Sequence, residues 1–254
     1  MELFDLEDKV AVVTGSSRGL GRLMAGGLAA AGARIVISGR NREQVEETAS
    51  DFGNAGYQVE GVAFDAKSRA DCQRLIDTAV DRFGRLDVLV ANHGGGQFDT
   101  ALDLDDKAWA ETLATNLTGV FYCCQIAARQ MVAQGEGGSI VVVSSTASTV
   151  AFPQLLAYGT SKAGIDQMVR QMASEWGEYQ IRVNAINPGY TTHRPRGPEY
   201  DASSETEQAI NNATPLGRSG LSEEFVGPIV FLASAASSYI TGTTLPVDGG
   251  YLIR

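Results

Sequence analysis

Short runs of β-branched residues recur along the chain, and each is followed by a longer stretch that favours helix. The first run, Val10-Ala11-Val12-Val13, shows no polar alternation, which is typical of a strand covered on both faces in a parallel sheet. A strand followed by a helix of ten or more residues forms a right-handed βαβ unit. The pattern predicts an α/β fold, a Rossmann-type doubly wound parallel sheet of about seven strands with helices on both faces.

The expected strands span residues 10–13, 34–38, 58–64, 88–91, 139–144, 182–187 and 244–247, and the expected helices span residues 20–31, 43–54, 69–83, 105–134, 158–179 and 223–233. No shift in composition divides the 254 residues, so we expect a single domain over residues 1–254. The extended irregular stretch begins at Pro188, after the sixth strand, where an open α/β sheet binds its ligands. We expect residues 188–213 to form a substrate-binding loop, or lid, within this domain.

Composition argues against several kinds of partner. With 20 Lys and Arg against 30 Asp and Glu, the formal net charge is -10, which disfavours binding to nucleic acid or an anionic membrane. No apolar run approaches the ~18 residues of a membrane helix, and the acidic start is unlike a signal peptide. Cys72, Cys123 and Cys124 form no CxxC pair, so we expect neither a metal site nor a disulfide framework. We therefore expect a cytoplasmic protein that acts on a small-molecule substrate.

Glycines punctuate the segment between the first strand and the first helix, which reads Thr14-Gly15-Ser16-Ser17-Arg18-Gly19-Leu20-Gly21. Glycines allow a tight turn and a close backbone approach, and the helix N-terminus offers unpaired N–H groups to a pyrophosphate. The G-x-x-x-G-x-G spacing only approximates the standard dinucleotide fingerprint, so a plain connection is the alternative. The position directly after a buried strand favours cofactor binding, with contacts at Gly15, Ser17, Arg18, Gly19, Leu20 and Gly21.

The end of the second strand indicates which dinucleotide is preferred. An enzyme that selects a free ribose 2′-hydroxyl places Asp or Glu here, whereas a 2′-phosphate requires positive charge. This chain has Gly39 followed by Arg40, and Arg18 lies in the adjacent loop, so two guanidinium groups are available for a phosphate. We expect NADP (NADPH) to be preferred, with NAD possible; the alternative is that Arg40 is a solvated residue at a strand end. Asp65, after the third strand, either caps the next segment or accepts a hydrogen bond from adenine.

A tyrosine and a lysine lie four residues apart in Tyr158-Gly159-Thr160-Ser161-Lys162, on one face of an expected helix. Ser145 follows a buried strand, which brings its hydroxyl to the same edge of the sheet. A phenol with a pKa of about 10 is a poor base at neutral pH, and a nearby ammonium lowers that pKa. Tyr158 could then exchange a proton with a substrate oxygen that Ser145 holds. The alternative is an ordinary surface pair.

These motifs, with Asn116 in Asn-Leu-Thr-Gly and Asn187-Pro188-Gly189, closely resemble the short-chain dehydrogenase/reductase superfamily over nearly the whole chain. The resemblance implies a proton relay of Asn116, Ser145, Tyr158 and Lys162, in which Tyr158 is the acid/base and Lys162 also contacts the nicotinamide ribose. It further implies a homotetramer. The additional cofactor contacts that it implies are Asp65 and Ala66 beside adenine, and Asn92, Gly94, Pro188, Gly189 and Thr191.

The chain departs from the family pattern at two histidines. The family commonly has Asn-Asn-Ala-Gly after the fourth strand, whereas this chain has Ala91-Asn92-His93-Gly94, and a usual threonine is replaced by His193. His93 either faces the substrate or packs a helix. Arg194 and Arg196 are candidates to bind an acidic substrate, although arginines in such a loop are often only solvated.

The primary hypothesis is an NADP-dependent oxidoreductase that moves hydride between nicotinamide and a secondary alcohol or ketone. The N-terminal region, together with Trp176-Gly177, resembles the gluconate 5-dehydrogenase branch, which favours a sugar acid or polyol as substrate. One alternative resembles 3-oxoacyl-carrier-protein reductase or a general ketone reductase. An alternative of a different class is a catalytically idle NADP-sensing protein, against which the intact relay residues argue.

Overall fold

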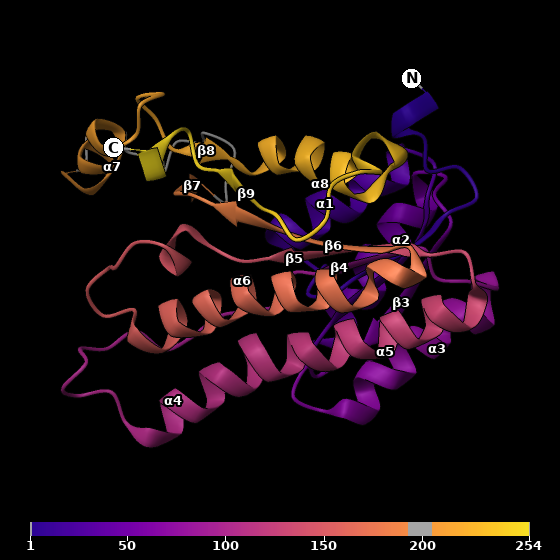
Figure 1. Cartoon of the computed structure of the whole chain (residues 1–254), viewed down its shortest axis with the longest axis horizontal. Coiled ribbons are helices and arrows are strands. Elements are labelled where there is room, and N and C mark those ends of the chain that lie inside the picture. Colours follow the sequence, from indigo (N-terminus) through magenta and orange to yellow (C-terminus); the bar gives the residue numbers. More distant parts are fainter. Residues whose placement is uncertain (1, 193–204, 254) are drawn as a thin grey trace.

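Seven parallel strands form the centre of the protein, as a computed structural model that describes residues 2–192 and 205–253 shows (Figure 1). Their order across the sheet is β3-β2-β1-β4-β5-β6-β9, and β1 pairs with β2 on one side and with β4 on the other. The predicted fold class is confirmed. The strands are β1 (Val10–Val13), β2 (Arg34–Gly39), β3 (Val59–Ala63), β4 (Val88–Ala91), β5 (Gly138–Val143), β6 (Ile181–Pro188) and β9 (Thr244–Val247).

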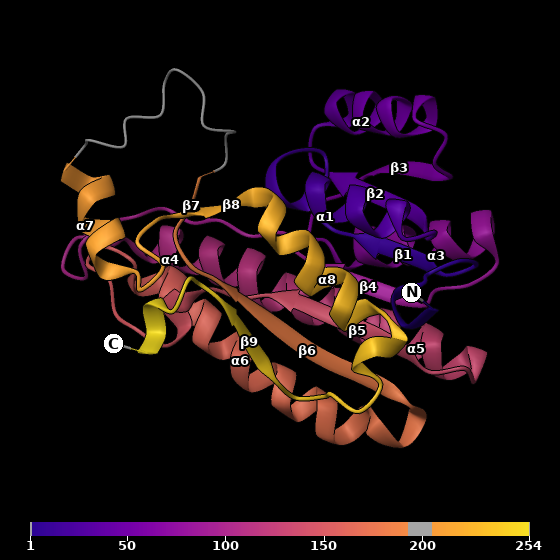
Figure 2. The same ribbon diagram turned by 90° about the horizontal axis from the view of Figure 1, so that it is seen from above.

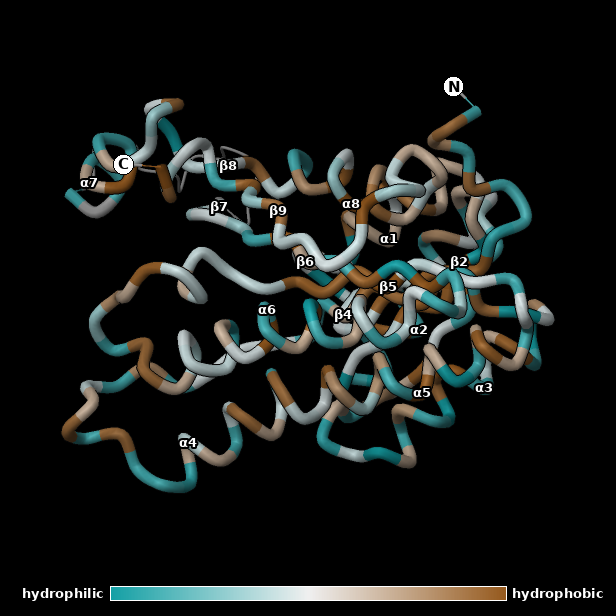
Figure 3. Tube along the Cα trace, in the orientation of Figure 1, coloured by the Kyte–Doolittle hydropathy of each residue, from teal (hydrophilic) through white to brown (hydrophobic). Residues whose placement is uncertain are grey.

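Helices cover both faces of this sheet (Figure 1). One layer contains α1 (Gly19–Ala30), α2 (Arg42–Asn54) and α8 (Val226–Ala233), and the other contains α3 (Arg69–Phe83), α4 (Asp106–Leu113), α5 (Gly119–Gln134) and α6 (Leu156–Trp176). Because alternate strand residues point to opposite faces, Val12 joins the core under α3, α5 and α6, while Val13 joins the core under α1 and α8. Figure 3 shows these strands as a hydrophobic centre inside more polar helices.

Local signals place the ends of several helices. Side-chain oxygens of Asn41, Ser68 and Asp105 accept hydrogen bonds from backbone N–H groups in the first turns of α2, α3 and α4. Gly84 and Gly135 follow α3 and α5 with φ of 84° and 74°, a left-handed conformation that glycine adopts at low cost. Capping and patterning therefore agree with the observed elements.

The structure corrects the prediction of one unbroken helix over residues 105–134. The segment Ala114–Thr118 is π-helical and separates α4 from α5, and the Gly119 N–H bonds to the carbonyl of Ala114, five residues earlier. Such segments carry one extra residue per turn and occur often at functional sites. Three further elements were not predicted: α7 (Glu205–Ala213) and the small parallel pair β7 (Thr191–Thr192) and β8 (Gly220–Leu221).

The sheet changes winding direction between β1 and β4, so the loops after these two strands diverge and leave room for a ligand. Figure 2 shows the same strands from above, with α1 and α8 crossing over them. In the described ranges 2–192 and 205–253, no helix combines the length and apolar character needed to cross a membrane. The candidate residues His193, Arg194 and Arg196 lie outside the described residues.

Candidate functional site

The glycine-rich loop after β1 is held tightly by hydrogen bonds to β2. The Ser16 hydroxyl donates to the Val13 carbonyl at 2.6 Å and accepts from the Ser38 N–H at 2.9 Å. The Ser16 N–H donates to the Ser38 carbonyl at 2.7 Å. Gly15 has a φ of 62°, and a Cβ on Gly21 would collide with the Gly15 carbonyl oxygen. These two glycines are therefore required by the backbone path itself.

The loop leads directly into α1, whose N-terminus carries no side-chain cap. Arg18, the residue before the helix, is extended, with φ of -163°, and its side chain makes no capping hydrogen bond. The first N–H groups of the helix consequently remain available to an anion. They lie beside a cleft of about 560 Å³ that Gly15, Ser17 and Arg18 line together with residues after β2, β3 and β4.

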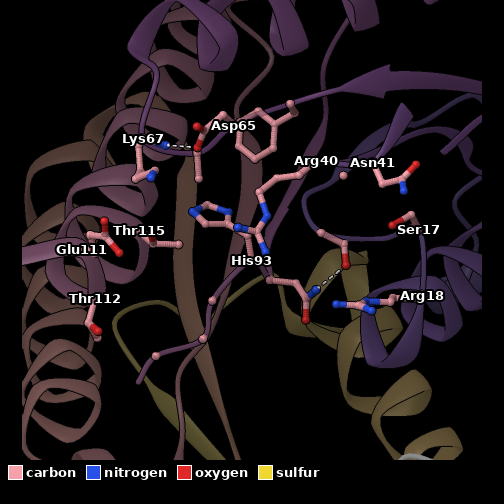
Figure 4. A pocket seen from close by; sticks show the side chains of 18 of the residues that line it. Ser17, Arg18, Arg40, Asn41, Asp65, Lys67, His93, Glu111, Thr112 and Thr115 are labelled. Atoms are coloured by element: carbon pink, nitrogen blue, oxygen red, sulfur yellow. Dashed lines mark hydrogen bonds between the residues drawn. The ribbon is translucent and has the colours of Figure 1, made fainter. Parts of the chain in front are cut away.

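Arg18 and Arg40 both line this cleft, as the sequence analysis anticipated (Figure 4). A Cβ added to Gly39 would lie 2.7 Å from the Ser17 hydroxyl, so Ser17 fills the space in which an acidic side chain would start. Arg18 and Arg40 thus line a cleft in which a side chain at position 39 would crowd Ser17. This arrangement makes the cleft suitable for an additional phosphate group.

Asp65 and Ala66 form another part of the cleft wall, after β3. One carboxylate oxygen of Asp65 accepts a hydrogen bond from the Lys67 N–H at 3.0 Å, which turns the chain back toward α3. Figure 4 shows this bond, with Lys67 beside Asp65. Asp65 therefore does cap the following segment. A role of the same carboxylate toward adenine stays a prediction.

His93 lies on the floor of the cleft and is only 8% exposed. Its Nδ1 is 2.8 Å from the Thr14 hydroxyl, and its ring meets Phe64 edge to face at a centroid distance of 5.5 Å. Burial lowers the pKa of His93 to about 3, so the imidazole is neutral in the folded protein. Its substrate-facing role stays a prediction, and the described contacts place it beside Thr14 and Phe64.

The four proposed relay residues converge at the end of this cleft. The Asn116 amide donates to the Ser161 hydroxyl at 3.0 Å and its oxygen accepts from the Gly95 N–H at 3.0 Å. Gly94 lies next to both Asn116 and Lys162, because a Cβ added to it would be 3.4 Å from the Asn116 oxygen and from Lys162 Nζ. The π-helical segment, which carries Asn116, and α6, which carries Lys162, therefore meet at Gly94. Lys162 Nζ donates to the Val143 carbonyl at 2.7 Å and stands 5.6 Å from the Tyr158 ring centroid.

Electrostatics at the relay differ from the expectation. Burial raises the pKa of Tyr158, and a hydrogen bond with Ser145 opposes that effect. Burial also lowers the pKa of Lys162 to about 8, while the carboxylate of Asp166 opposes that change. We expected the Lys162 ammonium to lower the pKa of Tyr158; the net shift is upward, and burial is its largest cause. The Lys162 ammonium is instead directed to a backbone carbonyl.

A second cavity, of about 400 Å³, opens beside Ser145. Phe98, Phe152, Gln154 and Tyr190 belong to its walls, as do Pro188 and Gly189 at the end of β6. Gly96 of the first cleft and Phe98 of this cavity both lie against Tyr158. Tyr158 therefore stands between the two spaces.

The structure brings together most, though not all, of the expected cofactor residues. Gly15, Ser17, Arg18, Arg40, Asp65, Ala66, Asn92 and Gly94 line the cleft. Gly19, Leu20 and Gly21 belong to α1, Pro188 and Gly189 line the second cavity, and Thr191 donates to the Gly189 carbonyl at 3.0 Å. Sequence reasoning missed further lining residues, of which Figure 4 labels Asn41, Lys67, Glu111, Thr112 and Thr115.

A signal existed for only some of these missed residues. Asn41 occupies a helix-capping position directly after Arg40, and that position could have identified it. Glu111, Thr112 and Thr115 reach the cleft from α4 and from the π-helical segment. The spacing of apolar residues does not reveal such a segment, so no signal in the sequence pointed to these three.

Comparisons with known proteins agree with this geometry. The family model described as enoyl-(acyl carrier protein) reductase matches residues 15–252. The 2-dehydro-3-deoxy-D-gluconate 5-dehydrogenase of Escherichia coli K12 is 39% identical over 254 residues, 100% of this chain and 99% of that protein. L-Rhamnose 1-dehydrogenase (NAD(P)(+)) of Azotobacter vinelandii is 38% identical and covers 98% of each chain.

A solved structure shows the same likeness. Gluconate 5-dehydrogenase from Burkholderia cenocepacia J2315, crystallised with NADP and tartrate, superposes with a TM-score of 0.92 at 34% identity, over 100% of this chain and 98% of that one. Sequence and fold thus agree across the full length. The chain belongs to the short-chain dehydrogenase/reductase family.

Proposed function

We propose that this protein is an NADP-preferring dehydrogenase that interconverts a secondary alcohol and a ketone in a sugar acid or polyol. The observation that carries the proposal is the convergence of Ser145, Tyr158, Lys162 and Asn116 between a nucleotide-sized cleft and a second cavity. The relatives that are named for sugar acids and for a neutral sugar support the substrate class.

The cleft fits a dinucleotide with an additional phosphate. The uncapped N-terminus of α1 suits the pyrophosphate, and Arg18 and Arg40 suit a 2′-phosphate. Ser17 fills the space in which the acidic residue of an NAD-selective site would start. When bound, the nicotinamide group accepts or returns the hydride.

In alcohol oxidation, Tyr158 would accept the hydroxyl proton of the substrate, while the hydrogen on the carbinol carbon would leave as hydride. A C=O bond forms from the electrons of the broken O–H bond. Ser145 holds the reacting oxygen by a hydrogen bond, and Lys162 supplies positive charge beside the phenol. Asn116 holds the backbone at Gly95, which positions the loop between cleft and cavity.

The direction of the pKa shift gives this mechanism a pH dependence. Tyr158 must be deprotonated to accept the proton in alcohol oxidation, and burial raises its pKa. Oxidation should therefore accelerate as pH rises above neutrality, whereas ketone reduction, which needs the protonated phenol, should slow as pH rises.

The test is NADP⁺ reduction with a panel of polyols and sugar acids, and NADPH oxidation with the matching ketones. The Tyr158→Phe variant should lose about 10³-fold in kcat, in the range of general acid–base catalysis, while its Kd for NADPH stays within about twofold. Tyr179→Phe, on a tyrosine that is 45% exposed, is the control. Near-normal kcat in Tyr158→Phe would show that the acid/base is wrongly assigned. Tight NADPH binding without turnover of any substrate would favour a sensor.

We also expect a homotetramer formed through α4, α5 and α6. Phe121 and Val132 on α5, and Leu156 on α6, are between 36% and 45% exposed, which leaves apolar surface for a second subunit. Light scattering coupled to size-exclusion chromatography measures the mass of the assembly. A monomer of 26.9 kDa would reject this expectation.

A further inference from the structure

We infer that the cavity beside Ser145 takes a neutral, hydroxylated ring, such as the closed form of a sugar or a cyclic polyol, in preference to an open chain or a carboxylate. This inference rests on the proposed function and narrows its substrate class to the neutral, cyclic members, so that a sugar acid is disfavoured. It is carried by the aromatic walls of the cavity, by their lack of charge and by the backbone of Gln154.

Two groups of aromatic rings contribute to the wall of the cavity. In one group Tyr190 meets Phe152 edge to face at 5.9 Å, and both rings contact Tyr251, at 5.7 Å and 6.0 Å. In the other the Phe98 ring meets Tyr158 at 6.2 Å and 80°. Tyr190 remains 40% exposed and Phe98 59% exposed, so each keeps ring surface that no part of the described chain covers. The mutual contacts hold these surfaces in place.

Such walls favour a flat, closed ring. The face of an aromatic ring is electronegative, and it attracts the partly positive C–H groups that a closed sugar ring gathers on one side. An open polyol chain presents its C–H groups in varying directions and must lose torsional freedom to lie flat. The shape of the cavity wall therefore favours a closed sugar ring over an open polyol chain.

Charge also disfavours a sugar acid at these walls. Among the described residues that line the cavity, none is charged; the polar side chains are those of Ser145, Thr146, Gln154 and Tyr190. A carboxylate placed against them would lose hydration without gaining an ion pair, which is costly. Hydroxyl groups, in contrast, are satisfied by neutral donors and acceptors.

Gln154, which lines the cavity, carries a neutral amide on a constrained backbone. It has a φ of 66°, a left-handed conformation that is uncommon for residues other than glycine and is often found at functional sites. The Gln154 carbonyl accepts a hydrogen bond from the Asp99 N–H at 3.1 Å, and the backbones of Asp99 and Leu155 form an isolated parallel β-bridge. The loop that carries Phe98 is thereby joined to the loop that carries Gln154. An amide that both donates and accepts is suited to a ring hydroxyl.

The experiment compares matched probes on the enzyme saturated with NADPH, with which an alcohol cannot react, by isothermal titration calorimetry. Each pair consists of an alditol and its 1,5-anhydro form, which has a closed ring; glucitol, mannitol and galactitol supply three pairs, and gluconate is the open-chain anion. At least one cyclic member should bind about fivefold or more tightly than its open partner and than gluconate, the size of an aromatic-face contact.

Variants test whether the aromatic wall causes this preference. Tyr190→Leu should remove the advantage of the ring and raise KM for cyclic substrates with little change in kcat, and Tyr190→Phe should show a smaller rise. Tyr239→Leu, on a fully exposed tyrosine, is the matched control and should keep the preference.

Three results overturn the inference. Equal or tighter binding of alditols or gluconate would do so, as would a ring preference that survives in Tyr190→Leu, or the failure of every cyclic probe to bind. Turnover of open-chain substrates would still leave the proposed function standing. Absence of turnover with every alcohol and ketone in the earlier panel would reject the proposed function as well.

Discussion

The nucleotide cleft and the cavity beside Ser145 lie on either side of Tyr158 but are built differently. The cleft begins at Thr14 and Ser16, which are fully buried and hydrogen bonded to neighbouring strands. The cavity is formed by rings on loops, and Phe98 and Tyr190 are substantially exposed. Backbone bonds and close contacts fix the cleft, whereas side-chain size shapes the cavity. Substitutions in the cleft should therefore weaken cofactor binding more than substitutions of similar size in the cavity weaken substrate binding.

The largest effect is expected at Gly21. A methyl group in Gly21→Ala would meet the Gly15 carbonyl oxygen, so the loop must shift and the N-terminus of α1 moves with it. We expect NADPH affinity to fall about 100-fold or more, as measured by fluorescence titration, because several charge-assisted hydrogen bonds are lost together.

Gly26→Ala, in the same helix, is the matched control. An added Cβ there meets only the Phe52 ring edge, at 3.6 Å, so binding should be preserved. If both variants bind NADPH normally, the cleft is not as rigid as its hydrogen bonds indicate.

Arg40→Ala should produce the next largest effect. Loss of a charge-assisted contact with the 2′-phosphate should weaken NADPH binding by about 10- to 100-fold and NADH binding much less. Arg42→Ala, on a neighbouring arginine that is 77% exposed, should change neither Kd. Equal losses for both dinucleotides would contradict the assignment of the 2′-phosphate site.

His93 should make stability depend on pH. In the unfolded chain its pKa returns to about 6.5, whereas burial holds it near 3 in the folded protein. As pH falls below 6.5, His93 takes up a proton in the unfolded state but not in the folded state, so the free energy of unfolding decreases. The decrease approaches about 1.4 kcal/mol per pH unit, and it continues until pH reaches the folded pKa.

Urea unfolding between about pH 6.5 and about pH 5 measures this slope above the range in which most carboxylates titrate. His93→Gln should show a shallower slope than the parent protein in that window. Identical slopes would mean that His93 is not held neutral by the fold.

The smallest effect is expected in the cavity. Phe98→Leu removes an aromatic surface but leaves an apolar side chain, so substrate KM should rise only about two- to fivefold, with Kd for NADPH unchanged. Leu102→Ala, at a leucine that is 98% exposed, is the control. If NADPH affinity fell by as much as KM rose, the cleft and the cavity would be mechanically coupled. The contrast between a rigid cleft and a cavity shaped by its side chains would then be wrong.

The elements that sequence reasoning predicted well are those with local signals. Val10–Val13 is apolar throughout because it is buried on both faces, and the spacing of Tyr158 and Lys162 places them on one helical face. The positions of Tyr158 and Lys162 in the proposed relay could therefore be named from the sequence. Their electrostatics could not, because the pKa of Tyr158 depends on how deeply the folded chain buries it.

Other parts depend on tertiary contacts that no local pattern contains. The aromatic group of Phe152, Tyr190 and Tyr251 joins three distant segments, so its existence becomes visible only in the fold. The close approach of Ser17 to Gly39 likewise depends on how the loop after β1 packs against the end of β2. The missing carboxylate at position 39 could be recognised from the sequence, but not the close approach of Ser17 to Gly39.

The π-helical segment Ala114–Thr118 also sets the rotational phase between α4 and α5. One residue of an α-helix corresponds to a rotation of about 100°, so deletion of a single residue here would restore a regular helix but turn α4 by that angle relative to α5. Ala127 and Met131 would keep their places in the core. Glu111 and Thr112 would turn away from the cleft. The surplus residue therefore lets α4 and α5, which follow one another directly, serve different purposes: α5 packs against the sheet, and α4 presents Glu111 and Thr112 to the cleft.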